Sequence, residues 1–73
     1  MLVNLIPIPQ STNVRAAGYD PATSTLVVEF RQNRRYSYAD VPIALFHELT
    51  DGHPHPWTRT GRRIKAHVPT RIN

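Results

Sequence analysis

Residues 25–31, TLVVEFR, form the clearest strand pattern in the chain, and they constrain its fold more than any other segment. Alternate positions are apolar, so that Leu26, Val28 and Phe30 share one face of the predicted strand. An isolated strand of this kind is not stable in water. The chain must therefore supply neighbouring strands and a cover for the apolar face.

The segments on either side predict those neighbours. Residues 13–19, NVRAAGY, precede the strand across a DPATS turn, in which Pro21 presets φ and the Asp20 side chain can bond the backbone just beyond. Residues 35–39, RYSYA, follow a short connection in which Asn33 tolerates positive φ. Together these segments predict a three-stranded antiparallel meander.

A helix is predicted over residues 41–50, directly after the meander. Asp40 is a plausible N-cap, and Gly52 suits the left-handed position after the helix end. The helix carries an apolar stripe at the i, i+3, i+4, i+7 spacing, made of Pro42, Leu45, Phe46 and Leu49. This stripe should cover the apolar face of the sheet.

The amino-terminal residues 1–10 form an apolar arm interrupted by Pro7 and Pro9. This arm could add a fourth strand at an edge of the sheet, or it could dock on a partner through Leu5, Ile6 or Ile8. It lacks the basic start of a signal peptide, and no segment is apolar enough to span a bilayer. We therefore expect a cytoplasmic, monomeric protein that does not associate with membranes.

The carboxyl-terminal part predicts a second, short helix. Pro54 and Pro56 could begin it, with Trp57 near its start, while Gly61 argues against a long helix and Pro69 ends any regular element. Residues 66–73 are interpreted as a basic tail. Residues 1–73 thus form a single α+β domain, in which a three-stranded or four-stranded antiparallel sheet is packed by one main helix and a short second one.

Catalysis and metal binding are both disfavoured. The chain has no cysteine and three glycines, and it contains neither a nucleophile elbow nor a phosphate-binding glycine loop. His53 and His55 supply at most two ligands, whereas zinc requires four donors, or three and a water molecule. We expect no enzymatic activity, no metal and no cofactor.

Positive charge is concentrated at the carboxyl-terminal end. The net charge is +4, and from Gly52 onward there are four arginines and one lysine but no acidic residue. Such a field attracts phosphates and acidic protein surfaces alike, and it is also typical of an ordinary solvated surface. Trp57 is expected in the core rather than as a stacking platform, because a small domain needs its largest apolar side chain inside.

An ordered set of short motifs resembles the KTSC domain, a module found alone and at the carboxyl end of some lysyl-tRNA synthetases. The motifs are a GYD turn at residues 18–20, a strand ending in Phe30, a Y-x-Y strand at residues 36–38, a VP helix start at residues 41–42 and an isoleucine–basic pair at residues 64–65. The chain departs from the family pattern at residues 50–56. The resemblance implies an antiparallel sheet with a packed helix, and it carries no catalytic residues.

Two functional expectations follow. The small size, single-domain format and basic tail resemble small bacteriophage regulators of host bacterial RNA polymerase. That resemblance implies binding to the amino-terminal region of the largest (β′) subunit, inhibition of initiation through interference with sigma-factor association, and antitermination. The residues expected to bind this partner are Arg59, Arg62, Arg63, Lys65, Leu5 and Ile6, with Val27 as a further exposed apolar anchor.

The alternative is an RNA- or tRNA-binding accessory module. Its phosphate contacts would come from basic residues of the hairpin and of the carboxyl-terminal third of the chain, namely Arg34, Arg35, Arg62, Arg63, Lys65 and Arg71.

Overall fold

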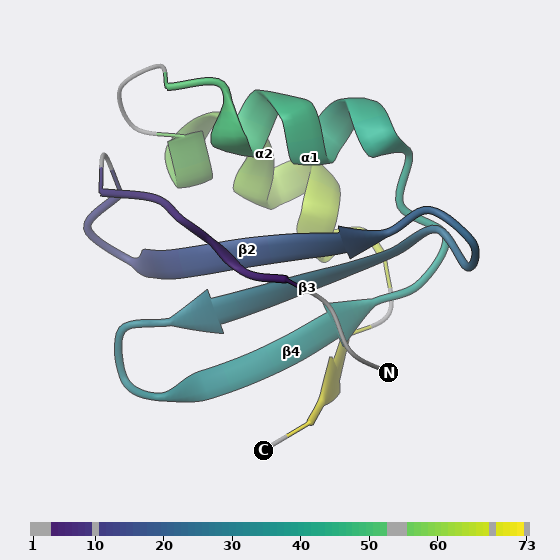
Figure 1. The fold of residues 1–73 in the computed structure, drawn as a ribbon, viewed down its shortest axis with the longest axis horizontal. Helices are drawn as coiled ribbons and strands as arrows, with labels where there is room; N and C mark the ends of the chain where they lie inside the picture. Colours follow the sequence, from purple (N-terminus) through teal and green to yellow (C-terminus); the bar gives the residue numbers. More distant parts are fainter. Residues whose placement is uncertain (1–3, 10, 53–55, 68, 73) are drawn as a thin grey trace.

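A computed structural model of the protein describes residues 4–9, 11–52, 56–67 and 69–72. It contains one antiparallel sheet of five strands in the order β1-β2-β3-β4-β5. The strands are β1 (Ile6–Pro7), β2 (Val14–Asp20), β3 (Thr25–Phe30), β4 (Arg34–Tyr38) and β5 (Pro69–Arg71). Two helices, α1 (Ile43–Thr50) and α2 (Pro56–Lys65), come between β4 and β5 in sequence. Both helices lie on the same side of the sheet (Figure 1).

The predicted meander is confirmed as β2, β3 and β4, with its turn residues in the expected roles. The backbone N–H of Ala22 donates a hydrogen bond to Oδ1 of Asp20 at 3.0 Å, which fixes the first turn. Asn33 has a φ of 60° in the second turn. The register places Val28 opposite both Ala17 and Tyr36, so the apolar faces of the three strands coincide.

The prediction of three or four strands is wrong, because both ends of the chain add an edge strand. β1 pairs with β2, with Ile6 opposite Ala17, and β5 pairs with β4, with Pro69 opposite Tyr38. The expectation that Pro69 ends regular structure is also wrong. A proline is tolerated at the first residue of an edge strand, where its missing N–H need not face a neighbour.

The helix over residues 41–50 is present, but it begins later than predicted and without the predicted cap. α1 begins at Ile43 after Pro42, and no side chain caps it. Asp40 instead occupies a left-handed turn position, with a φ of 56°. The predicted role of Gly52 is confirmed, since it follows the helix end with a φ of 87°.

The second helix is longer than predicted. α2 runs for ten residues, through Gly61, whereas α1 has eight. A Cβ atom built on Gly61 would lie 3.1 Å from Cε2 of Trp57, so the missing side chain makes room for the indole ring against the helix. Glycine lowers helix propensity by about 1 kcal/mol relative to alanine. Packing of the tryptophan offsets that cost here.

The core lies between the two helices and the covered face of the sheet. Its largest fully buried apolar side chains are Ile8, Leu26, Leu49, Ile64, Val14, Val28 and Val41. Ile8 and Val27 are only 2% and 5% exposed, so neither can be the exposed apolar anchor that the sequence suggested. None of the described helices is long and apolar enough to cross a membrane.

Candidate functional site

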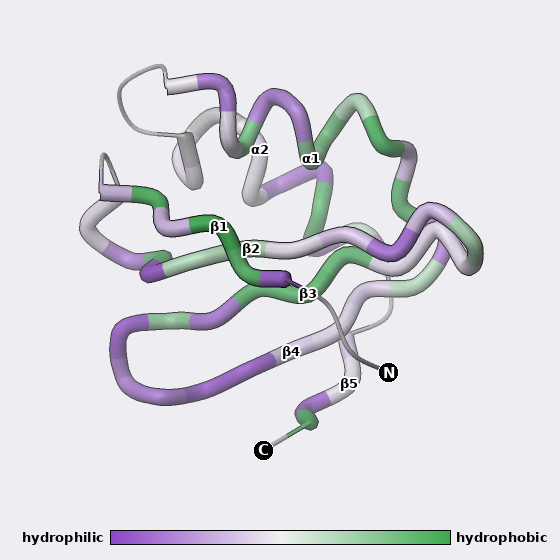
Figure 2. The backbone as a smooth tube through the Cα atoms, viewed as in Figure 1, coloured by the Kyte–Doolittle hydropathy of each residue, from purple (hydrophilic) through white to green (hydrophobic). Residues whose placement is uncertain are grey.

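An open hollow lies where α2 faces the end of the β3–β4 hairpin. Its volume is about 460 Å³, within the range of ligand-binding pockets. Three aromatic residues line it from β3, β4 and α2: Phe30, Tyr36 and Trp57. The hairpin that borders it is strongly hydrophilic, in contrast to the apolar stretch of β3 (Figure 2).

A second hollow, of about 610 Å³, continues along α2. It shares Asn13, Trp57 and Lys65 with the first, and Thr58 and Arg62 line its other part. The two hollows therefore form one continuous concave surface. We call this surface the basic groove.

The basic groove is lined by cations and by no carboxylate. Its cationic residues are Arg31, Arg34, Arg62 and Lys65, and none of the five acidic residues lies among the described residues that line it. Within the described part of the chain, Arg34, Arg62 and Lys65 form no ion pair. Their positive charge therefore remains uncompensated at the groove.

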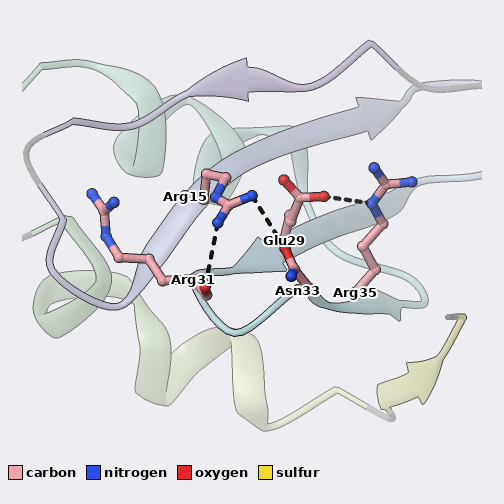
Figure 3. Close-up of polar contacts among 5 residues, drawn as sticks. All are labelled: Arg15, Glu29, Arg31, Asn33 and Arg35. Carbon is pink, nitrogen blue, oxygen red and sulfur yellow. Dashed lines mark hydrogen bonds and ion pairs between the residues drawn. The ribbon is translucent and has the colours of Figure 1, made fainter.

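The neighbouring arginines in sequence are neutralised elsewhere. Nε of Arg35 lies 2.8 Å from Oε2 of Glu29, which stands opposite it in the sheet (Figure 3). Arg63 pairs with Glu48 of α1. Both pairs are partly exposed, so each adds at most about 1 kcal/mol to stability. For binding they matter in another way, because the charges of Arg35 and Arg63 are already balanced by carboxylates.

The predicted basic residues are thus divided. Arg34, Arg62 and Lys65 come together at the groove, whereas Arg35 and Arg63 do not line it. Arg71 stands opposite Tyr36 in the β4–β5 pair, on the same side of the sheet as the first hollow.

The remaining predicted contacts are separated from the groove or not described. Leu5 is half-buried and Ile6 is 45% exposed, and neither lines either hollow of the groove. The side chain of Arg59 lies outside the described residues, as do His53 and His55.

The prediction that Trp57 packs in the core is confirmed, since it is 8% exposed. Its ring meets Phe30 edge-on at 5.2 Å between centroids, and Phe30 meets Tyr36 in the same way at 5.8 Å. The ammonium of Lys65 lies 5.7 Å from the Trp57 ring centroid, within cation–π range. The aromatic floor of the groove is therefore continuous with the hydrophobic core and rigidly held.

Sequence reasoning missed several polar residues of the groove, among them Asn13, Gln32 and Arg31. They follow or precede strands, where a turn residue is hard to distinguish from a ligand contact. The side-chain amides of Asn13 and Gln32 make no hydrogen bond within the described part of the chain. They can therefore offer both donors and acceptors to a ligand.

Local hydrogen bonds hold the edge of the groove in place. Oγ of Ser11 accepts from the backbone N–H groups of Asn13 and Val14, and the guanidinium of Arg31 donates to the carbonyl of Ser11 at 2.8 Å. Arg15 donates to Asn33 and to the carbonyl of Arg31 (Figure 3). These contacts join the start of β2 to the hairpin.

Beside the groove, burial raises the pKa of the Tyr38 phenol, and the nearby Tyr36 raises it further. Tyr38 is only 4% exposed and belongs to the core. The neutral phenol is therefore the form that the fold prefers.

These features define a class: a small antiparallel sheet covered on one face by two helices, with a cationic groove over an aromatic floor. A model of the KTSC domain family matches residues 10–53, more than half of the chain, and the protein belongs to this family. The crystal structure of a KTSC domain protein from Yersinia pestis has the same fold, with a TM-score of 0.82 at 20% identity. The match covers 99% of this chain and 100% of that one. A search of curated proteins finds no match.

Proposed function

We propose that the protein is a non-enzymatic, single-stranded nucleic-acid-binding module that holds its ligand in the basic groove. The observation that supports this function is that, in each of two pairs of adjacent arginines, one arginine lines the groove and the other forms an ion pair elsewhere. Arg34 and Arg62 line the groove without an ion pair among the described residues, whereas Arg35 and Arg63 are paired with carboxylates and do not line it.

The groove combines the two elements that such binding requires. Cations along a track neutralise phosphates, and aromatic and amide side chains beneath them contact bases. The aromatic floor favours a single strand, because a duplex would hide its bases from that floor. Both single-stranded RNA and single-stranded DNA fit this description.

The test is fluorescence anisotropy with labelled single-stranded RNA and DNA over a series of salt concentrations. With at most four phosphates neutralised, log K should fall against log salt with a slope no steeper than about −2.8. Arg34→Gln and Arg62→Gln should each weaken binding and make this slope shallower by about 0.7.

Arg35→Gln and Arg63→Gln are the matched controls, because each removes the same charge one residue away. They should leave the affinity and the slope nearly unchanged. Equal losses at Arg34 and Arg35, or no binding even at low salt, would contradict the proposed function.

A second candidate is binding to the largest subunit of bacterial RNA polymerase, as the resemblance to phage regulators implies. The observation that favours it is the 45% exposure of Ile6 on the edge strand β1. An exposed apolar side chain can insert into an apolar pocket of a partner and so anchor an interface.

This candidate is tested with purified bacterial RNA polymerase, with and without sigma factor, in a direct binding assay. Ile6→Asp should abolish binding and Arg35→Gln should not. A failure of the wild-type protein to bind the core enzyme, or undiminished binding by Ile6→Asp, would rule it out.

A further inference from the structure

Trp57 carries a hydrogen-bond donor that the fold leaves unused. No described residue accepts a hydrogen bond from its indole N–H. Every fully buried side-chain nitrogen or oxygen in the described residues nevertheless has a partner. The indole nitrogen is therefore not fully buried, although the side chain as a whole is 8% exposed.

The exposed part of Trp57 must open into the groove, because the residue lines both hollows. Three residues contact its ring. Gly61 leaves room for it on the helix, Phe30 meets it edge-on and the ammonium of Lys65 lies 5.7 Å from its centroid. A donor on a rigid, nearly buried ring is preorganised and loses little conformational entropy when a ligand binds.

Two cations stand beside this donor. Arg62 and Lys65 are three residues apart on α2, which makes them neighbours on the helix surface. Both line the second hollow with Trp57, and the hydroxyl of Thr58 lies there as well. All four side chains can donate hydrogen bonds, and no carboxylate lines this hollow among the described residues.

We infer that this hollow is an anion subsite, in which Trp57 N–H, Arg62 and Lys65 bind one phosphodiester of a single-stranded nucleic acid. The inference rests on the proposed function and assigns an orientation to the bound nucleotide. The phosphate lies against α2, and the attached base lies in the first hollow, between Tyr36 and the amides of Asn13 and Gln32. Trp57 thus acts through its N–H group and not as a stacking platform.

The test uses the single tryptophan of the chain, which gives one indole N–H resonance in the ¹H–¹⁵N spectrum of labelled protein. Four probes are titrated separately: a short oligouridylate, an abasic sugar–phosphate oligomer, inorganic phosphate and uridine. The oligouridylate and the abasic oligomer should both shift the indole resonance. Uridine should shift it much less than either oligomer, because its base occupies only the first hollow and it has no phosphate.

Charge-neutral variants identify the cations of the subsite. Lys65→Gln and Arg62→Gln should each weaken the binding that moves the indole resonance by about tenfold, the loss expected for one charge-assisted hydrogen bond. Arg63→Gln is the matched control on the same helix, and it should give the wild-type titration.

The outcomes separate the subsite from the proposed function. Binding of oligouridylate that moves resonances of Tyr36 and Arg34 but not the indole resonance would refute the subsite and leave the proposed function standing. A shift with inorganic phosphate but with neither oligomer would refute the phosphodiester assignment. No shift with any probe, together with no binding by anisotropy, would refute both.

Discussion

Gly61 determines where the indole ring of Trp57 lies. Gly61→Val should lower the free energy of unfolding by about 1–3 kcal/mol, because the added atoms would overlap a ring that cannot retreat past Phe30. Urea denaturation followed by circular dichroism measures this change without relying on the displaced fluorophore. Thr58→Val puts the same residue type, of nearly unchanged shape, at an exposed position of the same helix, and its stability should stay within about 0.5 kcal/mol of wild type. Equal stability of both variants would show that the ring is not confined by Gly61.

Tyr38 couples stability to alkaline pH. Its pKa is raised in the folded protein by burial and by Tyr36, so above the unfolded pKa of about 10 the unfolded chain binds fewer protons than the folded one. The contribution of this group to stability is fully present below that pH, and it is lost as the pH rises through the folded pKa. Urea denaturation from pH 8 upward should therefore show a loss beginning near pH 10. Tyr38→Phe should reduce this loss, and an identical pH profile in that variant would disprove the coupling.

At the scale of single elements, the chain leaves α1 through a residue in the left-handed conformation, Gly52. Gly52 has a φ of 87°, and no heavy atom of the described residues beyond its chain neighbours lies within 4 Å of the Cβ that another residue would add. Gly52→Ala should therefore lower the free energy of unfolding by about 1 kcal/mol, purely from left-handed strain. Gly52→Asn should lose less, because asparagine tolerates this region. Thermal denaturation of the three proteins should rank them glycine, asparagine, alanine, and any other order would point to contacts with solvent or side chains.

The strands and helices also show what could be predicted from the sequence. The meander was predictable because alternation and turn residues act locally, as in residues 25–31. β1 and β5 are short and contain proline, so only their pairing with β2 and β4 makes them strands. The continuation of α2 through Gly61 likewise depends on a tertiary contact. The Trp57 ring packs against Gly61, and this packing outweighs the low helix propensity of glycine.

For the candidate site, the sequence identified the basic residues but not which of their side chains face the groove. Strand alternation could have placed Arg34 on the face of Tyr36 and Tyr38, and Arg35 on the opposite face with Glu29. The rotation of α2, which separates Arg62 from Arg63, depends on packing against α1 and could not be read from spacing. Asn13 and Gln32 reach the groove only because the chain folds three strands and a helix around it.

At the scale of the whole molecule, both edges of the sheet are closed to further pairing by similar means. β1 and β5 are two and three residues long, and each contains a proline. Short edges with proline discourage pairing between sheets of different molecules. Concentrated solutions should therefore remain free of sheet-mediated association.

The pairing of β5 with β4 also has a consequence for the order of folding. Strands β2 to β4 pair with their nearest neighbours in sequence, and such local contacts form early. Tyr36 and Arg71 are separated in sequence by both helices, so they can pair only after the helices have packed. Closing so long a loop is slow. The pairing of β5 with β4 then fixes the chain that follows α2 against the sheet. We therefore expect the surface between α2 and the hairpin to form in the last step of folding, when the rest of the domain is already compact.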